Sequence, residues 1–465
     1  AECKHWDFDA ATRQARNAWN HLLGRIEAKG SQEELTNFYT AFYHTLIQPN
    51  NIADVDGTYR NAKGQPAKAE GGTFYSTFST WDTYRAAHPF YTLAVPEMVD
   101  PFVRSLVSQA EVQGHLPIWT LWGKENYCMI GNHSVSIVAE AYEKGFRGFD
   151  AERAFAAVKR TQTVSHKMKS DWEKYMRYGY FPCDSVTSES VSSTLESVYD
   201  DYAAACMARR MGKKEDAAYF TRRAAFYKNL FDPSTRFMRP KLSNGAWKTP
   251  FNPSDLAHAE SVGGDYTEGN AWQYTWHVQH DVPGLIALMG GKEAFCQKLD
   301  SLFTVKMKGQ SLADVTGLIG QYAHGNEPSH HVAYLYALAG KPERTQELVR
   351  EIVSTQYHPT PEGLCGNDDC GQMSAWYILS CMGFYPVDPV SANYVFGAPQ
   401  LPRISLSLPG GKRFTVVAEG LSEPNKYVKA IYLNGKRYRK NYISHADIVK
   451  GGELRFVMTA ERPSN

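Results

Sequence analysis

The sequence predicts a mainly α-helical protein, an α/α toroid followed by a small C-terminal antiparallel β segment. From residue 9 to about 388, apolar residues recur at helical spacing, and the helical segments are separated by long loops rich in Gly, Pro and aromatic residues. After Pro389 apolar and polar residues alternate, which is typical of strands. Long loops on a rigid scaffold commonly carry function, so we expect the site to lie on the loops.

Capping signals and periodicity predict the individual helices. Ser31 and Glu34 form a capping-box pattern, and apolar residues at helical spacing follow it. Ser193 and Glu196 open a similar segment, so we interpret Glu196 as a cap residue. Further helices are expected at residues 151–161, 214–230, 282–289, 293–303, 330–339, 342–357 and 373–379.

The change of pattern predicts three parts: linker helices at residues 1–30, a barrel at 31–388 and strands at 389–465. The segment after the barrel is small for an independent sandwich, so its strands need partners from elsewhere. The strands are expected at residues 404–408, 414–417, 428–433 and 454–458, with turns at Pro409-Gly-Gly and Asn434-Gly435.

Composition excludes some classes of function. The net charge of +1 gives no electrostatic basis for binding nucleic acid or anionic membranes. No apolar run reaches membrane-spanning length and no signal peptide opens the chain, which fits a mature periplasmic, secreted or cell-surface product and also a cytosolic one. The eight cysteines show no Cys-x-x-Cys pair, so buried free thiols are favoured, although Cys365 and Cys370 could be bridged.

The chain is organised around an acidic turn at residues 366–376. Asp368 and Asp369 lie between two glycines, directly before a helical run. An exposed acidic turn at a helix N-terminus would explain the carboxylates alone. The Asn, Gln, Ser and Trp of the same segment suit sugar hydroxyls and a sugar face, so we interpret Asp369 as the general base of a glycoside hydrolase.

A second carboxyl group, Glu268, precedes a glycine and a helical run that contains Trp272 and Trp276. It could be a helix-capping carboxylate. Beside tryptophans, however, a carboxyl group is partly desolvated and its pKa is raised. A general acid at neutral pH needs such a pKa.

Two further loops contain binding candidates. Trp81, Asp82 and Arg85 form either a surface ion pair beside a core tryptophan, or a sugar pocket in which Trp81 stacks and the charged groups hold hydroxyls. The oxygen donors of Asn326 and Glu327 suit a hard cation, chiefly Ca²⁺. Other polar loop residues receive no catalytic role here: Asn132, His133, Asp184, Glu189 and Glu196.

Together these blocks resemble glycoside hydrolase family 92, the calcium-dependent exo-α-mannosidases. The resemblance implies an (α/α)6 barrel, a bound Ca²⁺, hydrolysis with inversion, Glu268 as general acid and Asp369 as general base. Asp368 is the neighbouring carboxylate, and Asn367 stands where some members have a second acid. The matching blocks are residues 80–85, 268–274, 324–328 and 366–376; the sugar-binding candidates are Trp81, Asp82, Arg85, Trp272, Asn367 and His324, and the metal candidates are Asn326, Glu327 and Gln273.

The resemblance also implies a substrate and a missing part. The expected partners are α-mannose-containing glycans, such as N-glycans or mannans, with no predicted linkage preference. Family members carry an N-terminal β-sandwich ahead of the barrel, which this chain is expected to lack. The alternatives are a non-catalytic carbohydrate-binding protein on the same barrel and a metal-independent (α/α)6 glycosidase such as a glucosidase or trehalase.

Overall fold

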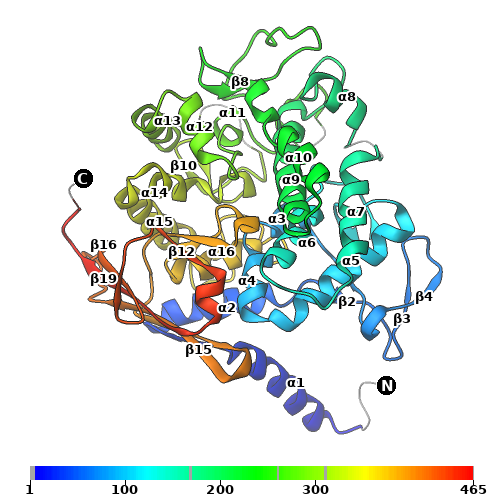
Figure 1. The fold of residues 1–465 in the computed structure, drawn as a ribbon. Coiled ribbons are helices and arrows are strands. Elements are labelled where there is room, and N and C mark those ends of the chain that lie inside the picture. Colours follow the sequence, from blue (N-terminus) through cyan, green and yellow to red (C-terminus); the bar gives the residue numbers. More distant parts are fainter. Residues whose placement is uncertain (1–5, 167–169, 259–260, 308–311, 464–465) are drawn as a thin grey trace.

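The computed structural model describes residues 6–166, 170–258, 261–307 and 312–463. The molecule is mainly helical, and strands gather near its C-terminal end (Figure 1). The α-helices are α1 (Phe8–Leu23), α2 (Gln32–Thr45), α3 (Thr80–Thr83), α4 (Ala87–Ala94), α5 (Val99–Gln113), α6 (Ser134–Glu143), α7 (Ala151–Thr163), α8 (Trp172–Tyr178), α9 (Ser190–Arg210), α10 (Lys214–Arg223), α11 (Ala271–Tyr274), α12 (Val282–Leu288), α13 (Lys292–Thr304), α14 (Leu335–Ala339), α15 (Pro342–Gln356), α16 (Gln372–Cys381) and α17 (His445–Val449).

The largest sheet has six strands, in the order β1-β14-β15-β19-β16-β17. It corrects two expectations. Residues 26–29 form strand β1, paired antiparallel with β14, and are not part of a linker helix. β15 and β19 pair in parallel, because the chain crosses over between them. The sheet is therefore mixed and not purely antiparallel. The strands are β1 (Ile26–Lys29), β14 (Arg403–Leu408), β15 (Lys412–Glu419), β16 (Tyr427–Leu433), β17 (Lys436–Tyr438) and β19 (Gly452–Thr459).

Strands and helices share one core. Phe38 and Trp376 from the helical part belong to the same buried cluster as Phe414 and Phe456 from the sheet. The smaller sheet β12-β13-β18 lies at the join, with β12 at Phe384–Tyr385, β13 at Asn393–Phe396 and β18 at Tyr442–Ser444. The expected β segment therefore completes its packing on the helices.

The helix ends follow local signals where these are strong. The capping box at α2 is confirmed: the Ser31 hydroxyl accepts from the Glu34 backbone at 3.3 Å, and the Glu34 carboxylate accepts from the Ser31 backbone at 2.7 Å. α2 packs against α16, which follows the acidic turn. α9 begins at Ser190, before the expected start, so Glu196 is inside the helix and is not a cap residue.

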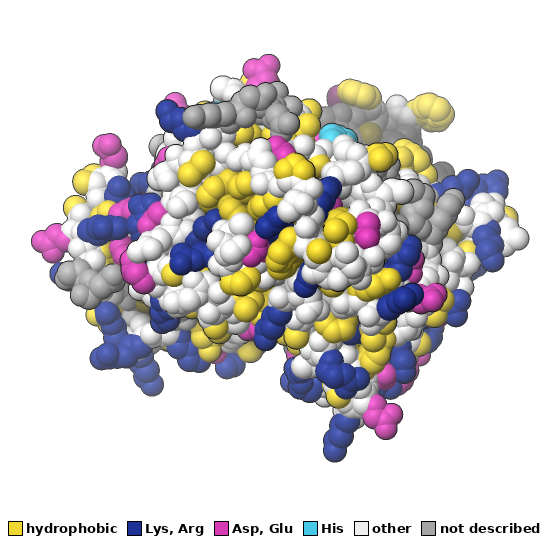
Figure 2. All heavy atoms as spheres, turned by 90° about the horizontal axis from the view of Figure 1, so that it is seen from above, with side chains coloured by type: hydrophobic (Ala, Val, Ile, Leu, Met, Phe, Trp, Pro, Cys, Tyr) yellow, Lys and Arg dark blue, Asp and Glu magenta, His cyan; other side chains and the backbone are white. Residues whose placement is uncertain are grey.

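Short hairpins between the helices carry the segments that form the site. On the face shown in Figure 2, Lys and Arg are interspersed with Asp and Glu. Among the described residues, every helix is too short or too polar to span a bilayer. The hairpins are β2 (Asn50–Asn51) with β5 (Tyr75–Ser76), β3 (Thr58–Arg60) with β4 (Pro66–Lys68), β6 (Thr120–Leu121) with β7 (Lys124–Glu125), β8 (Phe231–Asp232) with β9 (Phe237–Met238), and β10 (Leu318–Ile319) with β11 (Tyr322–Ala323).

Candidate active site

The acidic turn reverses the chain through three consecutive left-handed residues. Asp369 has a φ of 47°, Cys370 of 56° and Gly371 of 88°. Residues other than glycine rarely adopt this backbone conformation, which costs of order 1–3 kcal/mol at each of Asp369 and Cys370. A Cβ on Gly371 would lie 2.7 Å from the Cα of Thr45, so α2 passes too close for any other residue there. The tertiary structure therefore imposes the conformation of this turn.

The acidic turn lies directly on the loop that precedes Asn326. A Cβ on Gly366 would lie 2.6 Å from the carbonyl oxygen of Gly325. Glycine allows this approach of two backbones. Asn326 Nδ2 in turn donates to the carbonyl oxygen of Glu268 at 2.8 Å. Three segments that are far apart in the sequence thus meet at one place.

Three carboxylates converge where these segments meet. One oxygen each from Asp82, Glu327 and Asp369 lies within 4.8 Å of the other two. Burial raises the pKa of Asp82 well above its usual value, and the charges of Asp369 and Glu268 add to this effect, while a hydrogen bond from Ser79 opposes it. Burial and the charges of Asp369 and Asp82 likewise raise the pKa of Glu327. Such a group of acids attracts a cation.

Glu327 supplies the sharpest test of whether a cation fits. Its side chain is completely buried, and within the described part of the chain its only hydrogen-bonding neighbour is the carboxyl group of Asp369, another acid of the cluster. A buried carboxylate that has only another acid beside it is costly. Oxygen ligands from carboxylates and amides are what Ca²⁺ prefers, so the residues present suit that ion.

Glu268 lies in the same charged region and shares the unusual backbone of Asp369, with a φ of 47°. Burial raises its pKa to about 7, and the charges of Asp314 and Asp369 contribute, while His258 opposes them. Burial and the charge of Asp368 raise the pKa of Asp369 to about 6. The group expected to donate a proton therefore holds it at a higher pH than the group expected to accept one.

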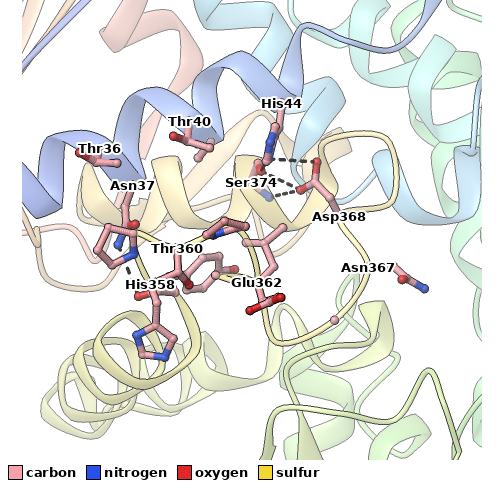
Figure 3. A pocket seen from close by; sticks show the side chains of 17 residues that line it. Thr36, Asn37, Thr40, His44, His358, Thr360, Glu362, Asn367, Asp368 and Ser374 are labelled. Carbon is pink, nitrogen blue, oxygen red and sulfur yellow. Dashed lines mark hydrogen bonds and ion pairs between the residues drawn. The ribbon is translucent and has the colours of Figure 1, made fainter.

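The side chain of Asp368 contacts different residues from that of Asp369. Its Oδ1 accepts from the backbone and the hydroxyl of Ser374, at 3.0 and 2.7 Å, and its Oδ2 lies 3.9 Å from His44 Nδ1. Burial raises its pKa, and these partners oppose the shift. Figure 3 shows His44 and Ser374 pointing toward Asp368, while Asn367 stands apart from this group.

Asp368 and Asn367 line a cavity of about 730 Å³. α2 forms one wall of the cavity and the loop after α15 another (Figure 3). The acidic turn separates this cavity from the three-carboxylate cluster, because Asp369 is in the cluster and Asp368 faces the cavity. The lining also includes Thr36, Asn37, Thr40, His44, His358, Thr360, Glu362 and Ser374.

Trp81 and Arg85 are buried next to the cluster and do not form a surface ion pair with Asp82. The Trp81 indole is 1% exposed and donates to Glu196 Oε1 at 3.0 Å. Arg85 Nε donates to the Trp81 carbonyl oxygen, and its Nη2 lies 3.5 Å from Glu196. The structural alternative, an exposed ion pair, is therefore wrong, and in this structure the ring of Trp81 is not an open stacking surface.

Three other candidates are held by contacts within the protein. Gln273 completes a capping box with Asn270 through Oε1 and donates to the Gln321 carbonyl oxygen through Nε2, so both ends of its amide are engaged. His324 lies between the hydroxyls of Tyr322 and Tyr357, at 2.8 and 2.7 Å.

Trp272 donates from its indole nitrogen to Ser254 Oγ at 3.3 Å, and the Lys298 ammonium lies 4.5 Å from its ring centroid. These contacts are sufficient to hold the indole in place. The cysteines that flank the acidic turn, Cys365 and Cys370, carry free thiols.

The residues that surround Trp81 and Arg85 were not recognisable as a group from the sequence. Glu196, His133 and Asp200 are completely buried and lie in contact: His133 Nε2 is 2.8 Å from Glu196, and its Nδ1 is 2.9 Å from Asp200. One signal was available, since Glu196 and Asp200 are four residues apart and therefore share one face of the helix. Two acids on a buried helix face need partners.

The chain is similar to proteins of known family and structure. The model of the glycosyl hydrolase family 92 catalytic domain matches residues 1–460. A GH92 alpha-mannosidase of Bacteroides thetaiotaomicron, solved with mannoimidazole, is 42% identical with a TM-score of 0.94, over 99% of this chain and 61% of that one. A GH92 inverting mannosidase of the same species is 34% identical with a TM-score of 0.90, over 99% and 64%.

A curated relative, an uncharacterized secreted glycosidase of Arthroderma benhamiae, is 26% identical over 99% of this chain and 58% of its own length. The chain thus spans about three fifths of the length of the relatives it matches.

Proposed function

The chain belongs to glycoside hydrolase family 92, and we propose that it is an inverting, calcium-dependent exo-α-mannosidase that removes terminal α-mannose from N-glycans or mannans. Two solved relatives, a GH92 alpha-mannosidase and a GH92 inverting mannosidase, support a mannoside as the substrate. The observation that carries the proposal is the pair of carboxyl groups Glu268 and Asp369, buried in one charged region, with pKa values of about 7 and about 6.

In the proposed reaction Glu268 donates its proton to the departing glycosidic oxygen. Asp369 takes a proton from a water molecule that attacks the anomeric carbon from the opposite face of the sugar. Inversion requires roughly 6.5–9.5 Å between the two carboxyl groups, which leaves room for that water. The rigid left-handed backbone at both residues fixes where the side chains project, and fixed geometry is what proximity catalysis needs.

We propose Glu327 and Asp82, with the amide oxygen of Asn326, as the residues that would hold the cation. Glu327 is the strongest candidate because its buried carboxylate has only the carboxyl group of Asp369 as a hydrogen-bonding neighbour among the described residues. Bound Ca²⁺ would supply positive charge for orienting and distorting the sugar. Gln273, also expected as a ligand, uses both ends of its amide in other contacts and is the weakest candidate.

We further propose that the helices close into the (α/α)6 toroid and that the protein acts outside the cytoplasm. The TM-scores of 0.94 and 0.90 to GH92 mannosidases support the architecture. The secreted curated relative supports a periplasmic, secreted or cell-surface location.

The proposal is tested by incubating the protein with α-1,2-, α-1,3-, α-1,4- and α-1,6-mannobiose, with Ca²⁺ or with a chelator. We expect mannose release from at least one linkage in Ca²⁺, with β-mannose as the first anomer seen by ¹H NMR, and none in chelator. Unchanged activity in chelator would favour a metal-independent glycosidase. Binding without hydrolysis of any linkage would favour a carbohydrate-binding protein.

A further inference from the structure

One buried carboxylate, that of Glu196 on α9, joins several parts of the active site. Its side chain is completely buried. Glu196 Oε1 accepts from Trp81 Nε1 at 3.0 Å and from the Tyr274 hydroxyl at 3.3 Å, and it lies 3.5 Å from Arg85 Nη2. The proposed mechanism gives this carboxylate no chemical step.

Two histidines approach the other oxygen of the same carboxylate. His133 Nε2 lies 2.8 Å and His277 Nε2 2.9 Å from Glu196 Oε2. Asp200 and Glu196 together raise the pKa of His133 to about 9 against the effect of burial, so this imidazole is charged at neutral pH. Its ring also stacks on Tyr84, with 4.2 Å between centroids. The charges of Glu196 and Asp200 are thus balanced by those of His133 and Arg85.

The partners of Glu196 come from segments that carry proposed site residues. Trp81 directly precedes Asp82, and Arg85 follows it by one helical turn. Tyr274 ends α11, the short helix that follows Glu268. The charge of Arg85 also opposes the rise in pKa of both Asp82 and Glu327, so the guanidinium acts on the cluster and on Glu196 at once.

Another buried carboxylate on α9, that of Asp201, has contacts of a different kind. Asp201 pairs with Arg223 Nη2 at 2.8 Å and accepts from the Tyr175 hydroxyl at 3.0 Å and from Gln162 at 3.1 Å. These partners lie on α10, α8 and α7, and none is adjacent to a proposed site residue. Asp201 therefore provides a structural comparison on the same helix, equally buried and also held by a buried arginine.

We propose that Glu196 is a positioning residue of the active site, which holds Trp81 and Arg85 in place and thereby fixes Asp82 in the carboxylate cluster. The inference rests on the proposed function for its effect on turnover. Removing one member of a buried ion pair leaves the other charge uncompensated. Loss of the Glu196 charge would therefore displace Arg85 and the segment that carries Asp82.

The test compares Glu196→Gln with Asp201→Asn, both checked for folding by circular dichroism. Calorimetry with mannoimidazole, the ligand of a solved relative, measures the site, and kcat and KM on the preferred mannobiose measure turnover. We expect both variants to unfold at lower temperature. Glu196→Gln should lose about tenfold or more in mannoimidazole affinity and in kcat, whereas Asp201→Asn should stay within about twofold.

Equal losses in both variants, or a folded Glu196→Gln with unchanged affinity and kcat, would overturn the proposal. Tyr274→Phe keeps the carboxylate and removes one donor, so it tests the same link if Glu196→Gln does not fold. We expect it to lose roughly threefold in affinity, in line with one hydrogen bond. Glu196→Asp keeps the charge and should recover part of the lost kcat, which a role in packing alone would not produce.

An NMR measurement that does not depend on enzyme activity tests the role of Glu196 separately from the proposed function. In ¹⁵N-tryptophan-labelled protein, the indole resonance of Trp81 is identified by its loss in Trp81→Phe. It should shift and exchange with solvent faster in Glu196→Gln but not in Asp201→Asn. If the wild type neither binds mannoimidazole nor cleaves a mannobiose, the proposed function fails, and this resonance alone decides whether Glu196 holds Trp81.

Discussion

At the scale of single residues, the acidic turn gives two adjacent carboxylates different roles. Asp369 lies with Asp82 and Glu327, whereas Asp368 is held by Ser374 and His44 at the edge of the cavity. The left-handed backbone at Asp369 separates the two side chains. We therefore expect Asp369 to contact the reacting water and Asp368 to keep the turn in place.

The pKa values at the site predict a pH optimum. The general base must be ionised, so kcat/KM should fall as the pH drops through the pKa of Asp369, which is about 6 without the ion and lower with Ca²⁺ bound beside it. The general acid must hold its proton, so kcat/KM should also fall as the pH rises through about 7, the value for Glu268. The measurement is the pH dependence of kcat/KM at saturating Ca²⁺.

Glu268→Gln should remove the alkaline limb of this profile and lower kcat by about 10²–10⁴-fold, the usual contribution of a positioned acid. Glu293→Gln, on the exposed surface of α13, is the matched control and should keep both limbs. If Glu268→Gln retained full kcat, another group would have to be the acid.

If Glu327 binds Ca²⁺, the ion should raise the thermal stability of the protein through this residue. Since a ligand that binds the folded state stabilises it, Ca²⁺ at a hundred times its Kd should add about 2.7 kcal/mol to the free energy of unfolding. Glu327→Gln should lose most of the rise in Tm that Ca²⁺ produces, because the buried carboxylate is removed. Glu362→Gln, at the cavity, should keep it. An equal rise in Tm in wild type and Glu327→Gln would place the ion elsewhere.

At the scale of elements, sequence patterns predicted the helices and turns that depend on residues close together in the chain. The capping box at Ser31, the helices at residues 151–161, 293–303 and 342–357, and the Asn434-Gly435 turn between β16 and β17 are confirmed. These features depend on neighbouring residues, which the sequence shows directly.

Elements that depend on distant partners were missed. β1 is a strand because β14 lies beside it, and β15 pairs in parallel with β19 because the chain crosses over between them. Likewise, the carboxylates of the site were recognisable as residue types in polar loops, but the burial that turned Glu196 from a cap residue into the centre of a charged group comes from tertiary packing. A pattern of three or four residues contains no information about such contacts.

The contact between Gly371 and α2 makes a prediction for the turn as an element. Gly371→Ala would place a Cβ 2.7 Å from Thr45 Cα, at a φ of 88°. Gly410→Ala has a similar φ, 73°, but no atom within 4 Å, so it serves as the control for backbone strain alone. We expect both to lose of order 1–2 kcal/mol of stability, and Gly371→Ala to lose more stability and most of its kcat as well. Equal effects on Tm and kcat would mean that the turn accommodates the methyl group.

At the scale of the whole molecule, helices and sheet are joined by buried polar contacts as well as by the shared core. Asp388, between β12 and β13, accepts from the hydroxyls of Tyr199 and Tyr202 on α9, at 3.0 and 2.9 Å. The ammonium of Lys144, directly after α6, donates to the Tyr394 hydroxyl on β13 at 2.9 Å. When a buried charge in one part of a protein is held by a partner in another part, the two parts tend to unfold together. Separating them would leave the charge without its partner, which is costly.

The last prediction follows from this join. Tyr394→Phe removes one of the oxygens that surround Lys144, whose side chain is completely buried, and should cost about 1–3 kcal/mol. Tyr438→Phe is the matched control, since the Tyr438 hydroxyl is buried without a hydrogen-bond partner among the described residues. We expect calorimetry to show a single unfolding transition in all three proteins, with Tm lowered by a few degrees in Tyr394→Phe alone. Two separate transitions in the wild type would mean that the sheet and the helices fold independently, and the join would then carry no cooperativity.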